Sequence, residues 1–236
     1  MRGRLNSHPT RHTTPQRYSY TLIKALFFDF DGLILDTETP EVKAWEQMFS
    51  QHDLEYPTHV WQNIVGRGPD QVEEQPAKLL KRLANLPQAE EEIHQEFRTI
   101  YFNILKHEPR PGVINLLENT PLPKFIVSSS DLNWVSGHLT TLNLGHHFQN
   151  RITRDLVTRT KPAPDLYLKA LELTNLNSHE VWALEDSENG LRAAKAAGIK
   201  TVVCPNPTTQ HLDFSLADAV VDSLESISYE WFQTAH

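Results

Sequence analysis

The feature that most constrains this chain is an apolar run, residues 22–28, that ends directly in Asp29 and Asp31. A carboxylate at the end of a buried strand must be paired, or its pKa shifts until the group is neutral. In open α/β sheets, ligands bind just outside the carboxyl ends of the strands. We therefore expect both acids at such an edge, compensated by a cation, a metal ion or water, and able to do chemistry there.

After residue 108 the chain alternates between strand and helix patterns. Predicted strands at residues 124–127, 151–153, 181–184, 201–204 and 219–221 alternate with predicted helices at 113–118, 132–142, 164–174, 187–197 and 224–232. This alternation predicts an α/β fold built on a doubly wound parallel sheet.

Between the first strand and this alternating part, the spacing of apolar residues is helical throughout. Predicted helices follow residue 36 and lie near residues 59–65, 70–83 and 88–105, separated by prolines and glycines. We predict three parts: a disordered tail at 1–20, an α/β core at 21–36 and 108–236, and an inserted helical cap domain at 37–107.

The composition narrows the class of protein. Hydrophobic residues make up 39% of the 236 and charged residues 22%, which is ordinary for a globular protein. A net charge of −8 argues against a nucleic-acid partner, and no apolar run approaches the ~20 residues that span a bilayer. The one cysteine, Cys204, cannot form an internal disulfide. We expect a cytoplasmic monomer, although the arginine-rich, acid-free tail also fits an organellar transit peptide.

Polar residues also follow other predicted strands. Ser128 follows residues 124–127, the pair Glu185 and Asp186 follows residues 181–184, and Lys161 lies in the turn before a predicted helix. In a parallel sheet these segments converge on one edge. Carboxylates suit Mg²⁺, whereas a lysine and a hydroxyl suit phosphate, so the sequence predicts a site for both.

At this point the sequence resembles the haloacid dehalogenase superfamily. The motifs that carry the resemblance are DFDGL at residues 29–33, the serine after FIV, KPAPDLY at 161–167 and LEDSENGLRAAKAAG at 184–198. The helical insertion after the first motif resembles the subgroup that includes β-phosphoglucomutase-like phosphatases. The resemblance implies a Rossmann-like core, a helical cap and a Mg²⁺-dependent hydrolase of phosphoric monoesters.

The resemblance also implies roles for the acids. Asp29 would be the nucleophile that becomes an aspartyl-phosphate, and Asp31 the general acid and base. The Mg²⁺ ligands would be the Asp29 carboxylate, the Asp31 backbone carbonyl and Asp186, with Glu185 beside them or among them.

For phosphate binding, the resemblance implies Ser128 on the phosphoryl oxygens, and Lys161 neutralising charge on that group and on the nucleophile. Ser129 is a further substrate-binding candidate. Arg67, in a glycine-flanked break of the cap, would contact the distal part of the substrate or be a solvated loop residue.

Two more residues each allow two interpretations of their role. Glu38 would face the substrate or cap a helix, and Asn189 would belong to the site or to a helix surface. Four aromatic residues are predicted to form the cap core rather than a platform for substrate: Trp45, Trp61, Phe97 and Tyr101.

The choice of reaction depends on one departure from the family. Mutases of this subgroup carry a cap histidine ten residues after the second motif-one aspartate, where this chain has Glu41. We therefore expect hydrolysis of a small phosphorylated metabolite such as a sugar phosphate, with a phosphosugar mutase as the alternative. A dehalogenase would lack Asp31. A phosphoryl-accepting receiver would lack the helical insertion, and a non-catalytic binding protein would be expected to have lost motif residues.

Overall fold

A parallel sheet forms the centre of the molecule. The computed structural model describes residues 22–68, 72 and 74–234, so the predicted tail lies outside the described residues. Within them, six parallel strands run in the order β3-β2-β1-β4-β5-β6. The strands are β1 (Ala25–Phe28), β2 (Lys124–Val127), β3 (Asn150–Ile152), β4 (Val181–Glu185), β5 (Lys200–Val203) and β6 (Ala219–Val220). The predicted α/β fold with a doubly wound parallel sheet is confirmed.

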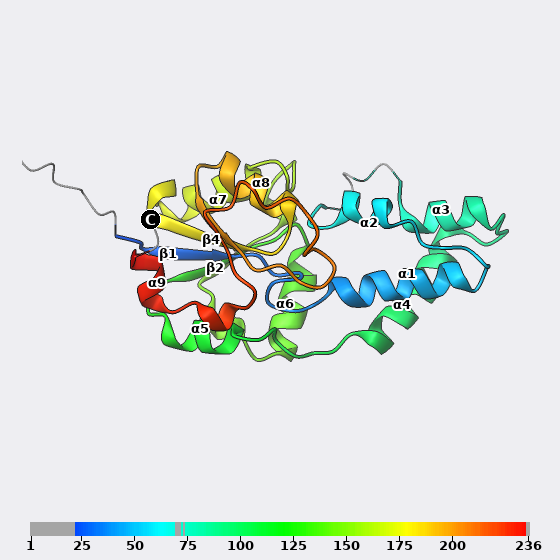
Figure 1. Cartoon of the computed structure of the whole chain (residues 1–236), viewed down its shortest axis with the longest axis horizontal. Coiled ribbons are helices and arrows are strands. Elements are labelled where there is room, and N and C mark those ends of the chain that lie inside the picture. Colours follow the sequence, from blue (N-terminus) through cyan, green and yellow to red (C-terminus); the bar gives the residue numbers. More distant parts are fainter. Residues whose placement is uncertain (1–21, 69–71, 73, 235–236) are drawn as a thin grey trace, which may run out of the picture.

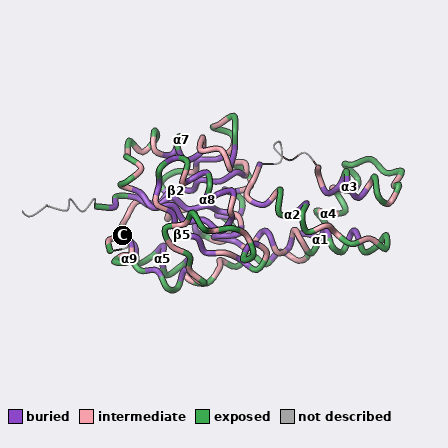
Figure 2. Tube along the Cα trace, turned by 45° about the horizontal axis from the view of Figure 1, so that its top comes forward, coloured by how far each residue is buried: buried purple, intermediate pink, exposed green. Residues whose placement is uncertain are grey.

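Helices cover both faces of this sheet. They are α5 (Val113–Asn119), α6 (Leu132–Thr141), α7 (Asp165–Thr174), α8 (Glu188–Ala196) and α9 (Tyr229–Thr234). Side chains alternate along each strand, so Leu26 and Phe28 pack with α5, α6 and α9, whereas Phe27 packs with α7 and α8. Burial on both faces explains why the strands read as continuous apolar runs (Figures 1 and 2).

The helical insertion forms a second lobe at one end of the molecule (Figure 1). Its helices are α1 (Glu38–Ser50), α2 (Thr58–Ile64), α3 (Pro76–Leu83) and α4 (Glu90–Ile104). It has a small core of its own, in which the Trp45 ring stacks on Phe97 with centroids 4.2 Å apart. The exact division into core and cap at residues 36–37 and 107–108 stays a prediction. Among the described helices, none is long and apolar enough to cross a membrane.

Most predicted elements differ from the structure by a residue or two at their ends, and three differ by more. The first strand begins at Ala25, and Leu22, three residues before it, is 62% exposed. The third insertion helix begins at Pro76, where proline takes the first helical position, and not at residue 70. The predicted helix 224–232 is two pieces, a 3₁₀ turn at Leu224–Ser226 and then α9, because the buried Ile227 is extended.

Candidate active site

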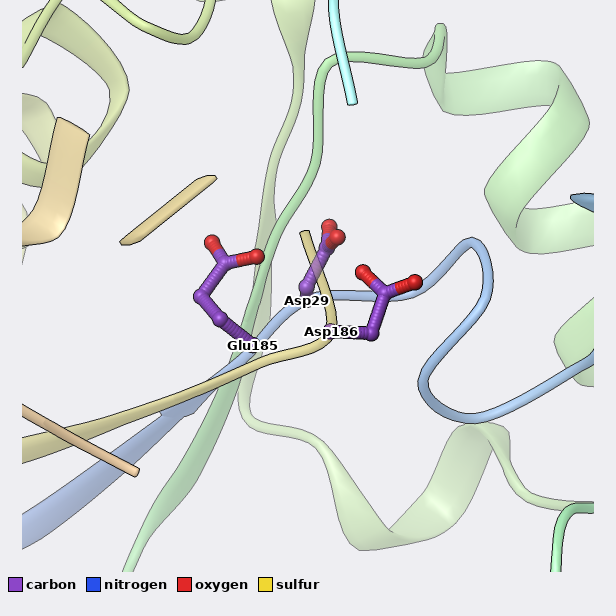
Figure 3. Close-up of side chains that lie close together, drawn as sticks. All are labelled: Asp29, Glu185 and Asp186. Atoms are coloured by element: carbon purple, nitrogen blue, oxygen red, sulfur yellow. The ribbon is translucent and has the colours of Figure 1, made fainter. Parts of the chain in front are cut away.

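Three carboxyl groups meet where the strand order reverses. Asp29 follows β1 and Asp186 follows β4, the two strands from which the sheet grows in opposite directions. The Asp29 backbone N–H donates to the Leu184 carbonyl (2.9 Å), which continues the ladder to the strand ends. Carboxyl oxygens of Asp29, Glu185 and Asp186 lie within 4.8 Å of one another, all buried. In Figure 3 the three carboxyl groups point to the same side, with Asp29 between the other two.

Lys161 is the cation of this cluster. Its Nζ lies 2.8 Å from Asp29 Oδ1 and 2.7 Å from Glu185 Oε1, with the side chain fully buried. The Tyr167 hydroxyl donates to the same oxygen of Glu185. Burial alone would lower the pKa of Lys161, but Asp29 and Glu185 raise it above its ordinary value. The lysine is therefore charged at any working pH.

The acids outnumber this one cation, and the cluster fits a divalent metal ion. Asp186 Oδ1 and Glu185 Oε2 are buried and make no hydrogen bond to the described residues. Burial raises the pKa of Asp29, with Glu185 adding to the shift, and burial raises that of Asp186, with Glu38 adding. Buried carboxylates left short of positive charge are what a hard cation such as Mg²⁺ satisfies. Asp29 and Asp186 could hold it.

One oxygen of Glu185, predicted to lie beside the metal ion or among its ligands, is bound by Lys161 and Tyr167. Only Oε2 is free to face an ion. The side chain fits because Gly190 of α8 has no Cβ, which would collide with the Glu185 carboxyl group. Its main contact is therefore with the lysine, and a place among the metal ligands stays a prediction.

Asp31 lies apart from the acid cluster. Its Oδ1 accepts hydrogen bonds from Thr37 Oγ1 (3.0 Å) and Trp134 Nε1 (2.8 Å), and Oδ2 accepts from Ser130 Oγ (2.6 Å). Ser128 Oγ is 3.4 Å from Oδ2. The side chain is therefore separate from any metal held by the acid cluster, in keeping with a prediction that gave the metal only the Asp31 carbonyl.

Glu38, the first residue of α1, is tied to the core. Asn206 Nδ2 donates to Glu38 Oε2 and to Asp186 Oδ2, the latter at 2.7 Å. Burial raises the pKa of Glu38 to about 7, against the opposing hydrogen bond from Asn206. Both readings of Glu38 are therefore incomplete, because the side chain lines the cavity and also fastens the insertion to the sheet edge.

A cavity of about 340 Å³ lies between the sheet edge and the insertion. Asp29, Asp31 and the serines 128–130 line it from the core, and Arg67 lines it from the insertion. Its aromatic walls are Trp45, Trp61, Phe97, Tyr101, Phe102 and Trp134. The prediction that the cap aromatics belong to the core alone was therefore incomplete, since they pack in the cap and also face the cavity.

The loop at residues 65–68 rests on the core through its backbone. Ser129 Oγ donates to the Gly66 carbonyl (3.1 Å), and Asn189 Nδ2 to the Val65 carbonyl (2.8 Å). The Gly68 N–H donates to Thr160 Oγ1 (2.9 Å). Asn189, predicted to bind substrate, does not line the cavity and holds this loop instead. Lys161 does not line the cavity either, so its contact is with Asp29 rather than directly with substrate.

The chain can now be compared with known proteins. Residues 26–204 match the sequence model of a family described as haloacid dehalogenase-like hydrolase. The chain belongs to this family. The protein YhcW of Bacillus subtilis, named as a candidate phosphatase, is 39% identical to this hydrolase over 212 residues, 86% of this chain and 93% of that one.

Two further matches extend the comparison. A phosphorylated carbohydrates phosphatase of Thermotoga maritima is 27% identical over 183 residues, 76% of this chain and 84% of that one. The β-phosphoglucomutase of Clostridium difficile matches this haloacid dehalogenase-like hydrolase with a TM-score of 0.68 and 21% identity, over 91% of this chain and 97% of that one. The predicted superfamily, its core fold and an enzyme of the phosphatase class are confirmed at this level.

Sequence reasoning missed several residues of this hydrolase's site. Their shared feature is a side-chain hydrogen bond to a predicted site residue, and they are Thr37, Ser130, Trp134, Tyr167 and Asn206. One signal was available for Asn206, which lies in the loop after β5, beyond Cys204 and Pro205. Nothing in the sequence marks Trp134 as a neighbour of Asp31.

Proposed function

We propose that this chain is a Mg²⁺-dependent phosphatase that hydrolyses a small phosphorylated metabolite through an aspartyl-phosphate on Asp29. The observation that carries the proposal is the setting of Asp29, which lines the cavity and has Lys161 Nζ 2.8 Å from Oδ1. Because Lys161 binds Oδ1 of Asp29, Oδ2 is the oxygen that would attack phosphorus. Asp186 and the free oxygen of Glu185 lie beside it as candidate metal ligands.

In the first step Asp29 Oδ2 forms a bond to phosphorus, and the bond from phosphorus to the leaving oxygen breaks. Asp31 gives its proton to that oxygen. In the second step water attacks phosphorus, the bond to Asp29 breaks, and Asp31 takes the proton of the water. Ser128 donates to the phosphoryl oxygens, and Lys161 stabilises charge on Asp29. Mg²⁺ held by Asp29, Asp186 and the Asp31 carbonyl would supply the positive charge that lets a carboxylate approach a phosphate dianion.

The cavity supports a small substrate. At about 340 Å³ it lies near the lower end of ligand pockets, so a metabolite of few carbons fits best. Arg67 lies on the insertion side of the cavity, where it would meet the part of the substrate remote from phosphorus. The likeness to a phosphatase named for phosphorylated carbohydrates supports a sugar phosphate.

Hydrolysis is proposed over phosphoryl transfer because of Glu41. This residue lines the cavity where the mutases of the subgroup carry a histidine. Burial, followed by the charges of Glu38 and Asp31, raises the pKa of Glu41 to about 8. The side chain is therefore mostly a neutral carboxyl at neutral pH and lacks the imidazole of the mutases.

The test is hydrolysis of p-nitrophenyl phosphate by the full chain with and without added Mg²⁺. We expect activity that requires Mg²⁺ and is removed by EDTA. Asp29→Asn is expected to lower kcat by at least about a thousandfold, because the amide is no nucleophile. An inactive wild type, or an Asp29→Asn variant with wild-type rates, would falsify the proposal. Circular dichroism of the variant checks that it is folded.

A further inference from the structure

An indole N–H donates a hydrogen bond to Asp31, the residue proposed to transfer the proton. Trp134 Nε1 donates to Asp31 Oδ1 at 2.8 Å, from a helix far along the chain. Trp134 also lines the active-site cavity. An indole N–H can only donate, whereas a hydroxyl can donate or accept. The oxygen that the indole binds must therefore stay a hydrogen-bond acceptor.

The hydrogen bonds divide the two oxygens of Asp31. Oδ1 accepts from Trp134 and from Thr37 (3.0 Å), which occupies both of its acceptor positions. Oδ2 accepts from Ser130 at 2.6 Å, and Ser128 lies at 3.4 Å, near the limit of a hydrogen bond. The Ser130 hydroxyl can turn to accept a hydrogen bond from a protonated Oδ2, but the indole N–H can only donate. A proton on Asp31 is therefore best placed on Oδ2.

The indole is held firmly enough to impose this geometry. The Trp134 backbone N–H donates to Asp131 Oδ1 (2.8 Å), which caps α6, and the His138 ring lies 4.3 Å from the indole. From the insertion, the rings of Tyr101 and Phe102 lie 6.2 and 6.3 Å away. The core fixes the backbone of Trp134, and α4 closes over its ring.

We propose that Trp134 is a positioning residue for Asp31: its N–H holds Oδ1, so that Oδ2 is the oxygen that exchanges the proton with the leaving group and then with water. This role rests on the proposed phosphatase function. It also connects proton transfer to the insertion, because the indole that orients Asp31 packs against α4.

The chemistry of the leaving group separates this role from a structural one. p-Nitrophenolate leaves without help from an acid, whereas phenolate, whose conjugate acid has a pKa of about 10, needs protonation. The two aryl esters have nearly the same shape. A loss of proton transfer therefore affects phenyl phosphate, whereas a loss of binding or folding affects both esters alike.

The experiment compares kcat/KM for phenyl phosphate and p-nitrophenyl phosphate in wild type and Trp134→Phe. The variant keeps a ring against α4 and loses the N–H. We expect kcat/KM to fall about tenfold or more for phenyl phosphate and within about twofold for p-nitrophenyl phosphate. Equal losses on both esters, or no loss, overturn the positioning role. A wild type inactive on both esters instead overturns the proposed function, and this assignment with it.

Trp182→Phe is the matched control. Trp182 is buried in β4, and its indole N–H has no hydrogen-bond partner among the described residues. The substitution therefore changes packing but removes no hydrogen bond. The ratio of the two kcat/KM values should stay at the wild-type value. If Trp134→Phe does not fold, the indole proton resonance of Trp134 gives a second measurement. It should move upfield in Asp31→Ala, and an unmoved resonance contradicts the hydrogen bond.

Discussion

At the scale of single residues, Gly190 decides where Glu185 can lie. A Cβ on Gly190 would collide with the Glu185 carboxyl group, which is fully buried against Lys161 and Tyr167. An alanine would favour the helix by ~1 kcal/mol on propensity alone. The collision should outweigh this gain, because the displaced carboxylate loses its lysine.

We therefore predict that Gly190→Ala lowers the free energy of unfolding by about 2 kcal/mol or more and lowers kcat with it. Urea denaturation and p-nitrophenyl phosphate hydrolysis measure the two effects. Gly137→Ala is the control, because a Cβ there meets nothing within 4 Å on the helix α6. The free energy of unfolding of Gly137→Ala should rise by up to ~1 kcal/mol. The same gain at Gly190 would show that Glu185 has room to move.

Most of the predicted site residues that lie together follow strand ends, whereas Lys161 comes from the turn before α7. Asp29, Ser128 and Asp186 each follow an apolar run, so the periodicity that predicts a strand also places them at one edge. Trp134 and Tyr167 lie inside helices, where the sequence looks the same whether the side chain faces core or site. Their partners depend on how helices pack, which no local pattern contains.

At the scale of elements, the loop at residues 65–68 is fastened to three separate core segments. Ser129, Thr160 and Asn189 each bind its backbone, and Arg67 between the two glycines lines the cavity. Gly66 has φ +74° and no room for a Cβ against Ser187, so the loop lies close to the sheet edge. The proposed contact between Arg67 and substrate thus depends on hydrogen bonds made by the backbone of neighbouring residues.

Asn189→Ala removes one of these bonds and leaves the Val65 carbonyl without its donor. One such bond contributes about 1 kcal/mol, so we predict that kcat/KM falls about fivefold while the melting temperature changes by a few degrees. Asn119→Ala, an exposed asparagine on α5, should leave kcat/KM at the wild-type value. Unchanged kcat/KM in Asn189→Ala would contradict a role for the loop in substrate binding.

The elements themselves were predicted well where packing and local preference agree. The strand at Lys124–Val127 has the predicted bounds, because an apolar run buried on both faces leaves no alternative. The helix predicted over 224–232 is broken, because burial of Ile227 outweighs the local helical pattern. Contact between the insertion and the core could not be predicted, since part of it is made through the backbone of the loop at residues 65–68 and part through rings of α4 against Trp134.

At the scale of the whole molecule, the cavity is closed by two lobes that both carry acids. Core and insertion place Asp31, Glu38 and Glu41 around the same space. Burial and the first two acids raise the pKa of Glu41 to about 8, from an ordinary value of 4.5. The two lobes therefore bring several carboxylates close together. In the metal-free protein, Glu41 takes up a proton, which lowers their mutual repulsion.

This uptake makes the stability of the metal-free protein depend on pH. Between the ordinary pKa of Glu41 and its raised value in the folded state, the folded chain binds a proton that the unfolded chain has lost. Stability is therefore greatest below the lower value and declines as pH rises toward about 8. The decline should be on the order of 1–3 kcal/mol, because water in the cavity screens part of the shift.

Thermal melting in EDTA at a series of pH values from about 5 to about 8 measures this decline. Glu41→Gln has no titrating group at this position, so its melting temperature should fall less steeply with pH. The gain in melting temperature over wild type should be largest at the alkaline end. Glu46→Gln is the control, because Glu46 lies on the same helix with its side chain in water. A wild-type melting temperature that rises over this range, or a Glu41→Gln curve parallel to it, would mean that the closed cavity does not hold the proton on Glu41.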